Sequence, residues 1–275
     1  MALELDDRQR AMLQEMGVRV WLPGTAFALD QGELPREPAT LPSAPQAIVA
    51  PPQRPAVTPA TVAAPKVAPT ASGIVPAVGQ LDWAALADAA ANCQACGLYT
   101  GRKHSTLQVP ETAAQADWFF VGDPPDEDED QSGHAFAGQA GQLLDNMFKA
   151  MGARRGASGR NGAYATNIVK CRPPVGRVPQ AEDVAQCAAY LQRELALVRP
   201  KVIVAMGRLA TAHLLSEHPA ALALPLGKQR GTVYRYRGIP VVVTYAPKIL
   251  LRASADKAKA WADLCLALDI RDGLQ

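Results

Sequence analysis

The chain has 275 residues, of which 48% are apolar and 20% charged, and its formal net charge is +2. That length can form one or two domains, and the small charge neither indicates nor excludes a nucleic-acid partner. No run of about 18 apolar residues is present, so we expect no membrane-spanning helix and no membrane partner. The N-terminus, MALELDDRQR, lacks the apolar stretch of a secretory signal, which predicts a cytoplasmic protein.

The first predicted element is a short amphipathic helix within residues 6–21, DDRQRAMLQEMGVRVW. Its two leading aspartates can cap a helix, its methionines and leucine form one apolar face, and Gly17 can end it. The VRVW stretch that follows is typical of extended chain. We treat residues 1–30 as a short peptide of their own.

A proline-rich segment follows this peptide. Residues 35–76 contain 11 of the 23 prolines, separated by small residues, and they contain no aromatic residue. Such a segment buries too little surface to offset its ordering entropy. We therefore predict that residues 31–79 form a disordered, partly polyproline-like linker.

Residues 80–275 alternate apolar strands with amphipathic helices, which predicts an α/β domain. Short apolar strands separated by helices favour a parallel sheet covered on both faces, and an Arg-Gly turn predicts an antiparallel hairpin at one end. Working residues in such folds follow the C-terminal ends of the strands. The strand candidates are 117–122, 163–169, 201–207 and 232–245, and the helix candidates are 81–90, 139–151, 181–198, 207–217 and 255–268.

The five cysteines are candidates for a metal centre. Cys93 and Cys96 form a C-x2-C pair that can reach one metal or cluster from a single turn, and Cys171 and Cys187 follow further along the chain. Zinc uses the same spacing, and burial of free thiols is the third reading. Cys265 lies on the apolar face of a predicted helix and is expected to be a core residue.

Seven motifs in order resemble the family-4 uracil-DNA glycosylases. They are CxxCxL, VGDPPDEDED, GHAFAGQAGQLLD, TNIVKCRPP, CAAYL, PKVIVAMGRLA and LLRASADKAKAWADL, and together they span about residues 81–268. The resemblance implies a three-layer α/β/α sandwich with a central four-stranded, mostly parallel sheet. It also implies a [4Fe-4S] cluster bound by Cys93, Cys96, Cys171 and Cys187.

An enzyme of this family flips a base out of DNA, stacks it on an aromatic ring and reads its Watson–Crick edge. The resemblance assigns the stacking ring to Phe136 and the reading amide to Asn167, whereas a core Phe and an Asx turn are the structural alternatives. Gly122 and Gly138 match positions that line the base site. Basic positions that contact DNA in the family correspond to Arg252 and Lys257 in this sequence, although both side chains could equally be solvated.

The sequence departs from the family in the segment GDPPDEDED, residues 122–130. Asp123 replaces the family's glutamate and is our candidate catalytic carboxylate. Asp126 replaces a glycine, which adds bulk and charge where close backbone approach is expected. Six carboxylates in eight positions would repel DNA phosphates, and a solvated acidic loop or a cation site are the alternative interpretations.

A second departure is TYAPKILLR, residues 244–252, where Ala246 replaces the histidine that supports charge on the leaving uracil. Losing one such donor costs about 10²–10³ in rate. Among the histidines, which are His104, His134, His213 and His218, only His134 neighbours the expected pocket, and Lys248 and Tyr245 flank the gap. We therefore expect a protein of DNA repair or replication whose glycosylase activity is weak or lost; the alternative is an active uracil-DNA glycosylase of base excision repair.

Residues 10–24, RAMLQEMGVRVWLPG, resemble the N-terminal peptide of the psi subunit of the bacterial DNA polymerase III clamp loader. The resemblance implies docking on clamp-loader subunits through Met16, Val18 and Trp21. An ordinary amphipathic segment is the alternative. A hydrophobic peptide on a long linker would raise the effective concentration of the attached domain at its partner.

Overall fold

The computed structural model describes residues 78–110 and 115–273. The predicted N-terminal peptide, residues 1–30, and nearly all of the predicted linker, residues 31–79, lie outside the described residues. Their interpretation stays a prediction. Within the described ranges, no helix is both long and apolar enough to cross a membrane.

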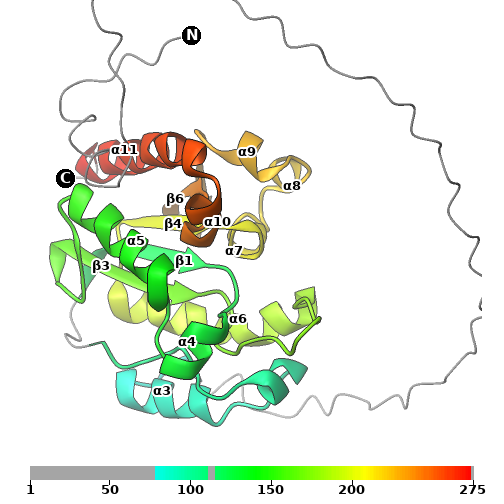
Figure 1. Ribbon diagram of the computed structural model, residues 1–275. Coiled ribbons are helices and arrows are strands. Elements are labelled where there is room, and N and C mark those ends of the chain that lie inside the picture. The colour runs from blue at the N-terminus through cyan, green and yellow to red at the C-terminus, as the bar shows by residue number, and fades with distance from the viewer. Residues whose placement is uncertain (1–77, 111–114, 274–275) are drawn as a thin grey trace, which may run out of the picture. The chain divides into compact units, whose positions relative to one another are not determined.

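The sheet runs through the middle of the domain (Figure 1). Its spatial order is β2 (Arg154–Arg155), β3 (Gly159–Asn167), β1 (Ala116–Gly122), β4 (Val202–Met206), β6 (Ile239–Thr244) and β5 (Val233–Tyr236). All neighbouring strands are parallel except β5 and β6, which form the predicted antiparallel hairpin. The α/β class is confirmed, but the sheet has six strands rather than four, because the two-residue β2 and the outer hairpin strand extend the parallel centre.

Alternate residues of the central strand serve two separate cores. Phe119 and Val121 of β1 pack with helices α3 (Trp83–Ala91), α6 (Ala181–Val198) and α7 (Arg208–Leu214). Trp118 and Phe120 pack with helices α5 (Gly138–Ala150), α10 (Pro247–Arg252) and α11 (Lys257–Gly273) on the other face. This two-residue period of a sheet covered on both faces gives the expected three layers.

Several short elements were too brief to leave a helical period in the sequence. They are η1 (Gly97–Gly101), α4 (Glu127–Ser132), α8 (Pro219–Leu222), α9 (Leu226–Gln229) and η2 (Ser254–Asp256). The helix α4 forms because Asp126 and Glu129 make a reciprocal capping box at its first turn. The longest predicted helix, residues 181–198, coincides with α6.

A fully buried ion pair lies beneath the C-terminal end of β3. Lys170 donates from Nζ to Glu194 at 2.6 Å, to the Thr166 hydroxyl at 2.6 Å and to the Asn167 carbonyl at 2.8 Å. The other Glu194 oxygen accepts from the Tyr164 hydroxyl at 2.8 Å. Buried charges are tolerated only when paired in this way. The network therefore fixes the backbone that carries Asn167.

Candidate functional site

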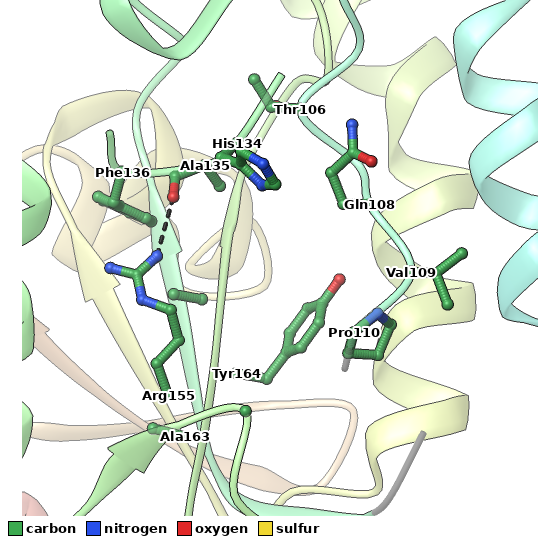
Figure 2. Close-up of a pocket in the computed structure, with 12 residues that line it drawn as sticks. Thr106, Gln108, Val109, Pro110, His134, Ala135, Phe136, Arg155, Ala163 and Tyr164 are labelled. Carbon is green, nitrogen blue, oxygen red and sulfur yellow. Dashed lines mark hydrogen bonds between the residues drawn. The ribbon is translucent and has the colours of Figure 1, made fainter. Parts of the chain in front are cut away.

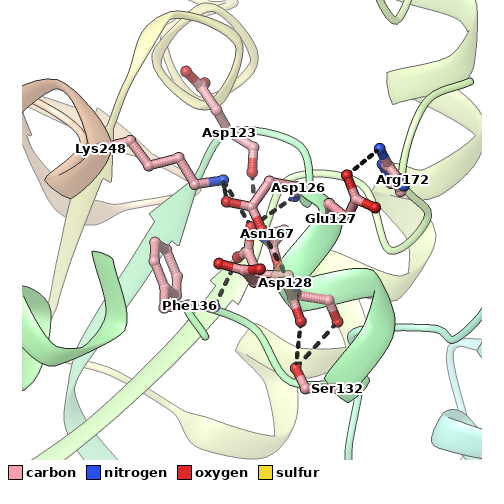
Figure 3. Close-up of polar contacts among 10 residues, drawn as sticks. Asp123, Asp126, Glu127, Asp128, Ser132, Phe136, Asn167, Arg172 and Lys248 are labelled. Atoms are coloured by element: carbon pink, nitrogen blue, oxygen red, sulfur yellow. Dashed lines mark hydrogen bonds and ion pairs between the residues drawn. The ribbon is translucent and has the colours of Figure 1, made fainter. Parts of the chain in front are cut away.

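The candidate site lies where the C-terminal ends of β1 and β3 meet, as expected for a parallel sheet. Gly122 is the register partner of Asn167. The segment after β1 leads into α4, and the segment after β6 leads into α10. Figure 3 shows Phe136, Asn167, Asp126 and Lys248 gathered at this edge. Four of the positions predicted from the sequence are thus brought together: Gly122, Asp123, Phe136 and Asn167.

Phe136 is held over the end of the sheet in a conformation that few non-glycine residues adopt. Its φ is 57°. A Cβ on Gly122 would collide with its ring, and a Cβ on Gly141 would collide with its carbonyl oxygen. The Phe136 N–H donates to Glu129 at 2.7 Å. The ring is therefore positioned by two close glycine contacts and one buried carboxylate, as a functional position with backbone strain would be.

Asn167 is 1% exposed and its amide orientation is determined by its neighbours. Its Nδ2 donates to the Asp123 carbonyl at 3.0 Å and to Glu129 Oε1 at 2.9 Å. The opposite orientation would place Oδ1 against two acceptors. Oδ1 therefore faces the other way, where it is buried and has no hydrogen-bond partner within the described part of the chain. A buried acceptor without a donor costs free energy unless a ligand supplies one.

Glu129 is the centre of the site, although it is 1% exposed. Besides Asn167 and Phe136, it accepts from the Asp126 N–H at 2.8 Å and from Lys248 Nζ at 2.8 Å. One carboxylate thus connects the stacking ring, the reading amide, the first turn of α4 and the start of α10. Sequence analysis did not single out Glu129, because it resembled its acidic neighbours.

The segment 122–130 is not the solvated acidic loop that we had considered. Glu129 and Asp130 are buried, and Asp130 accepts from the backbone N–H of Lys103 at 2.8 Å. Only Glu127 and Asp128 are exposed, and Glu127 contacts Arg172 at 3.3 Å. Among the described residues, no group of three or more His, Cys, Asp or Glu side chains could hold a metal ion, so a cation site here has no support.

Asp123 directs its carboxylate away from Asn167 (Figure 3). It accepts from the backbone N–H groups of Arg208, Leu209 and Ala210, at 2.8–3.2 Å, and so caps α7. Gly207 permits this approach, because a Cβ there would collide with the carboxylate. Burial raises the pKa of Asp123 in spite of these bonds. Its predicted catalytic role stays a prediction, and its observed contacts are structural.

Ala246 is buried and begins α10 without a side-chain cap. Lys248, two residues after Ala246, forms ion pairs with Asp126 Oδ2 and with Glu129 Oε2, each at 2.8 Å. Burial by itself would raise the pKa of Asp126. Hydrogen bonds from Lys248 and from the Glu129 N–H outweigh the effect of burial, so the pKa of Asp126 is lowered. Burial likewise opposes the charge on Lys248, and the two carboxylates overcome it and raise the pKa of Lys248. The pair is therefore ionic at neutral pH.

His134, considered above as a substitute for the missing histidine, faces a different space. It is exposed and lines a cavity of about 370 Å³ together with Gln108, Arg155 and Tyr164. Figure 2 shows its ring facing this cavity. The Phe136 loop borders the cavity as well, but no hydrogen bond joins His134 to Asn167, Glu129 or Lys248. The geometry gives no support to a rescue by His134.

The predicted DNA-contacting positions lie at the edge of the site. Arg252 is exposed at the end of α10, next to Leu251, which is 44% exposed, and Lys257 begins α11. Gly138 begins α5 with a φ of 63°, and a Cβ there would come within 2.7 Å of the Asp128 carboxylate. An acidic group thus lies beside the N-terminus of α5.

The four candidate cluster ligands lie in three segments: the turn after α3, the loop after β3, and α6. Burial, with contributions from neighbouring thiols, raises the pKa of Cys96 to about 11 and that of Cys187 to about 12. Cys171 accepts from Arg102 at 3.3 Å, and burial raises its pKa too. Cys265 lies in α11 against the second core, as predicted.

The comparisons with known proteins agree with this fold. The model of the uracil DNA glycosylase superfamily matches residues 109–265. The type-4 uracil-DNA glycosylase of Pyrobaculum aerophilum is 36% identical over 180 residues, which cover 64% of this chain and 87% of that protein. The type-4 enzyme of Thermotoga maritima is 33% identical over 168 residues, 61% of this chain and 82% of that protein.

The chain belongs to the uracil DNA glycosylase superfamily. The type-4 uracil-DNA glycosylase of Sulfurisphaera tokodaii is 35% identical over 164 residues, which cover 58% of this chain and 71% of that protein. The resemblance inferred from the seven motifs is thereby confirmed at the level of the superfamily, with type-4 relatives. The individual site roles and the consequences of the departures are taken up below.

Proposed function

We propose that this domain binds DNA and recognises a flipped-out uracil, while its capacity to excise that base is weak. The observation that carries this proposal is the buried, unpartnered Oδ1 of Asn167 next to the Phe136 ring. Uracil carries an N3–H donor, whereas cytosine carries an acceptor at N3. An acceptor held at the end of β3 therefore favours uracil over cytosine.

Excision needs more than recognition, because negative charge develops on the leaving base. The type-4 family places a histidine where this chain has Ala246, and the methyl group of alanine cannot donate a hydrogen bond. The nearest cation, Lys248, is shared between two carboxylates. Asp126, Glu129 and Lys248 together carry one net negative charge, which disfavours a departing anion. These features support weak rather than efficient excision.

The test is equilibrium binding to single-stranded DNA that contains one 2′-fluoroarabino-uridine, or its cytidine counterpart, as the matched control. The fluorine disfavours the sugar cation, so the base stays attached during the measurement. We expect tighter binding to the uracil strand, and we expect Asn167→Ala to remove about 10-fold or more of that preference. Equal affinity of the wild-type protein for both strands would contradict the proposal.

We also propose that Cys93, Cys96, Cys171 and Cys187 hold a [4Fe-4S] cluster. The donor chemistry supports it: the four thiols come from three segments, and Cys171 accepts a hydrogen bond from Arg102 at 3.3 Å. Among the described residues, no group of three or more His, Cys, Asp or Glu side chains is placed to hold a metal ion, so the proposal rests on the donor chemistry and on the type-4 relatives.

Such a cluster would tie the turn after α3 and the helix α6 to the residue that follows Lys170, and so would stabilise the back of the base site. Iron and sulfide analysis of anaerobically purified protein tests the assignment. We expect about four of each per chain in the wild type and in Cys265→Ser, and a large loss in Cys187→Ser. Zinc in place of iron would contradict it.

The N-terminal peptide supports a second proposal, which rests on its sequence alone. We propose that Met16, Val18 and Trp21 dock the protein on a clamp-loader subunit, with residues 31–79 as the tether to the glycosylase-like domain that begins near residue 80. Binding of full-length protein to that subunit is expected to weaken with Trp21→Ala. Unchanged affinity in a chain that lacks residues 1–30 would rule this out.

A further inference from the structure

One departure from the family pattern, Asp126, contacts a residue that lies close in sequence to the other, Ala246. Asp126 stands where the family has glycine, and Lys248 lies two residues after the missing histidine. Their side chains form an ion pair at 2.8 Å, and they are 39% and 36% exposed. Beneath them lie Glu129 and Asn167, each 1% exposed. The pair is therefore joined to Asn167 through Glu129 and belongs to the candidate site rather than to a remote surface.

The Asn167 amide cannot read uracil by itself in this chain. Uracil presents an imino N–H beside a carbonyl, so its recognition needs an acceptor beside a donor. Both Nδ2 hydrogens of Asn167 already go to the Asp123 carbonyl and to Glu129. Only the acceptor, Oδ1, remains for the base. The donor must come from another group.

Lys248 is placed to be that donor. Its ammonium has three N–H groups, of which Asp126 and Glu129 take two. Glu129 holds Lys248 Nζ at one carboxylate oxygen, at 2.8 Å, and Asn167 Nδ2 at the other, at 2.9 Å. The ammonium and the amide are therefore neighbours on a single carboxylate.

We propose that Lys248 is the donor half of a two-residue reading pair, in which Asn167 Oδ1 accepts the imino N–H of the flipped base and the Lys248 ammonium donates to the adjacent carbonyl. This inference deepens the proposed function and rests on it. Asp126 positions the ammonium, so that the two departures act together. Cytosine is rejected twice, because its N3 faces an acceptor and its amino group faces a cation.

The pair defines a chemical class of ligand, namely bases with an imino N–H beside a carbonyl. Uracil belongs to it, and so does the deaminated purine hypoxanthine, through N1–H and O6. Thymine shares the same edge, so its exclusion must depend on the space around its methyl group. The class distinguishes this site from one that reads uracil with both atoms of a single amide.

The test compares uracil and cytosine binding, with the fluoroarabino strands described above, in wild type, Lys248→Met and Lys248→Arg. Lys248→Met keeps most of the side-chain volume and removes the donor. We expect it to reduce the ratio of cytosine Kd to uracil Kd by about 10- to 100-fold. Lys248→Arg keeps a donor and should recover much of the ratio. Asp126→Asn keeps the helix cap but removes the ion pair that positions the ammonium, so it should lower the ratio by less than Lys248→Met does.

The results of these binding measurements distinguish a Lys248 that reads the base from one that only attracts phosphate or has no role. An equal loss of affinity for both strands in Lys248→Met would mean that the lysine attracts phosphate only, and would overturn the inference. An unchanged ratio would overturn it as well. A wild-type protein with no preference would overturn the proposed function itself. Thermal unfolding of each variant shows whether the fold is intact, and the double variant Asp126→Asn/Lys248→Met provides a charge-balanced version if the single one is unstable.

Discussion

Replacing Ala246 by histidine is expected to raise the single-turnover rate of uracil release by about 10²–10³-fold. The physical reason is that position 246 lies at the end of β6, beside the start of α10, where the type-4 pattern places its histidine. A donor there stabilises charge on the departing base in the transition state, but it adds little to binding of the intact base. Rates are measured with protein in excess over a uracil-containing single strand.

The matched control is Ala246→Leu, which adds bulk without a hydrogen-bond donor and should not raise the rate. A second version combines Ala246→His with Asp126→Gly, because the carboxylate adjoining the site opposes a departing anion. We expect the combination to exceed the single variant. If the histidine variant and the leucine control are equally slow although both bind uracil, loss of the histidine is not what limits excision.

Removing Glu129 is expected to have the largest structural effect. In Glu129→Ala four donors lose their shared acceptor: the Asp126 and Phe136 N–H groups, the Asn167 amide and the Lys248 ammonium. Breaking a buried charged network of this kind costs about 3–5 kcal/mol in the free energy of unfolding. The Asn167 amide would also lose one of the two contacts that fix its orientation, so uracil preference should fall with stability.

Urea denaturation compares this variant with Asp128→Ala, which removes an exposed carboxylate from the same helix. The control is expected to change stability by less than about 1 kcal/mol. Equal and small effects in both variants would mean that Glu129 behaves as a surface residue. Glu129→Gln, which retains one acceptor oxygen, should fall between the two.

The order of strands and helices could be predicted from the sequence because it depends on local periodicity. The apolar run of β1 and the amphipathic pattern of α6 each extend far enough to identify their elements. The edge strand β2 could not be predicted in the same way. β2 has two residues and exists only through its pairing with β3, a contact that no local pattern encodes.

Site residues could be predicted from the sequence where their type differs from that of their neighbours, and could not be predicted within a run of the same type. Phe136 and Asn167 stand out from their surroundings, and the structure brings both to the same strand ends. Glu129 was hidden among five other carboxylates, and its role depends on Lys248, 119 positions further along the chain.

Because Asp126 forms an ion pair with Lys248, the two departures are interpreted differently when they are considered together than when each is considered alone. From the sequence, Asp126 indicated repulsion of DNA phosphates, and Ala246 indicated only the loss of a histidine. In the fold, Asp126 is paired with Lys248, and Lys248 lies next to the Asn167 amide. In the proposed reading pair, Asp126 therefore affects how the site reads a base, whereas Ala246 affects how it releases one.

The account is tested most directly by single-turnover release of uracil by the anaerobically purified wild-type protein, at concentrations that saturate the uracil strand. It predicts that the strand is bound with preference over cytosine while release is about 10²-fold or more slower than with the Ala246→His variant. Rapid release by the wild-type protein, at the rate of the histidine variant, would contradict the claim that recognition has been retained while support for the leaving base has been lost.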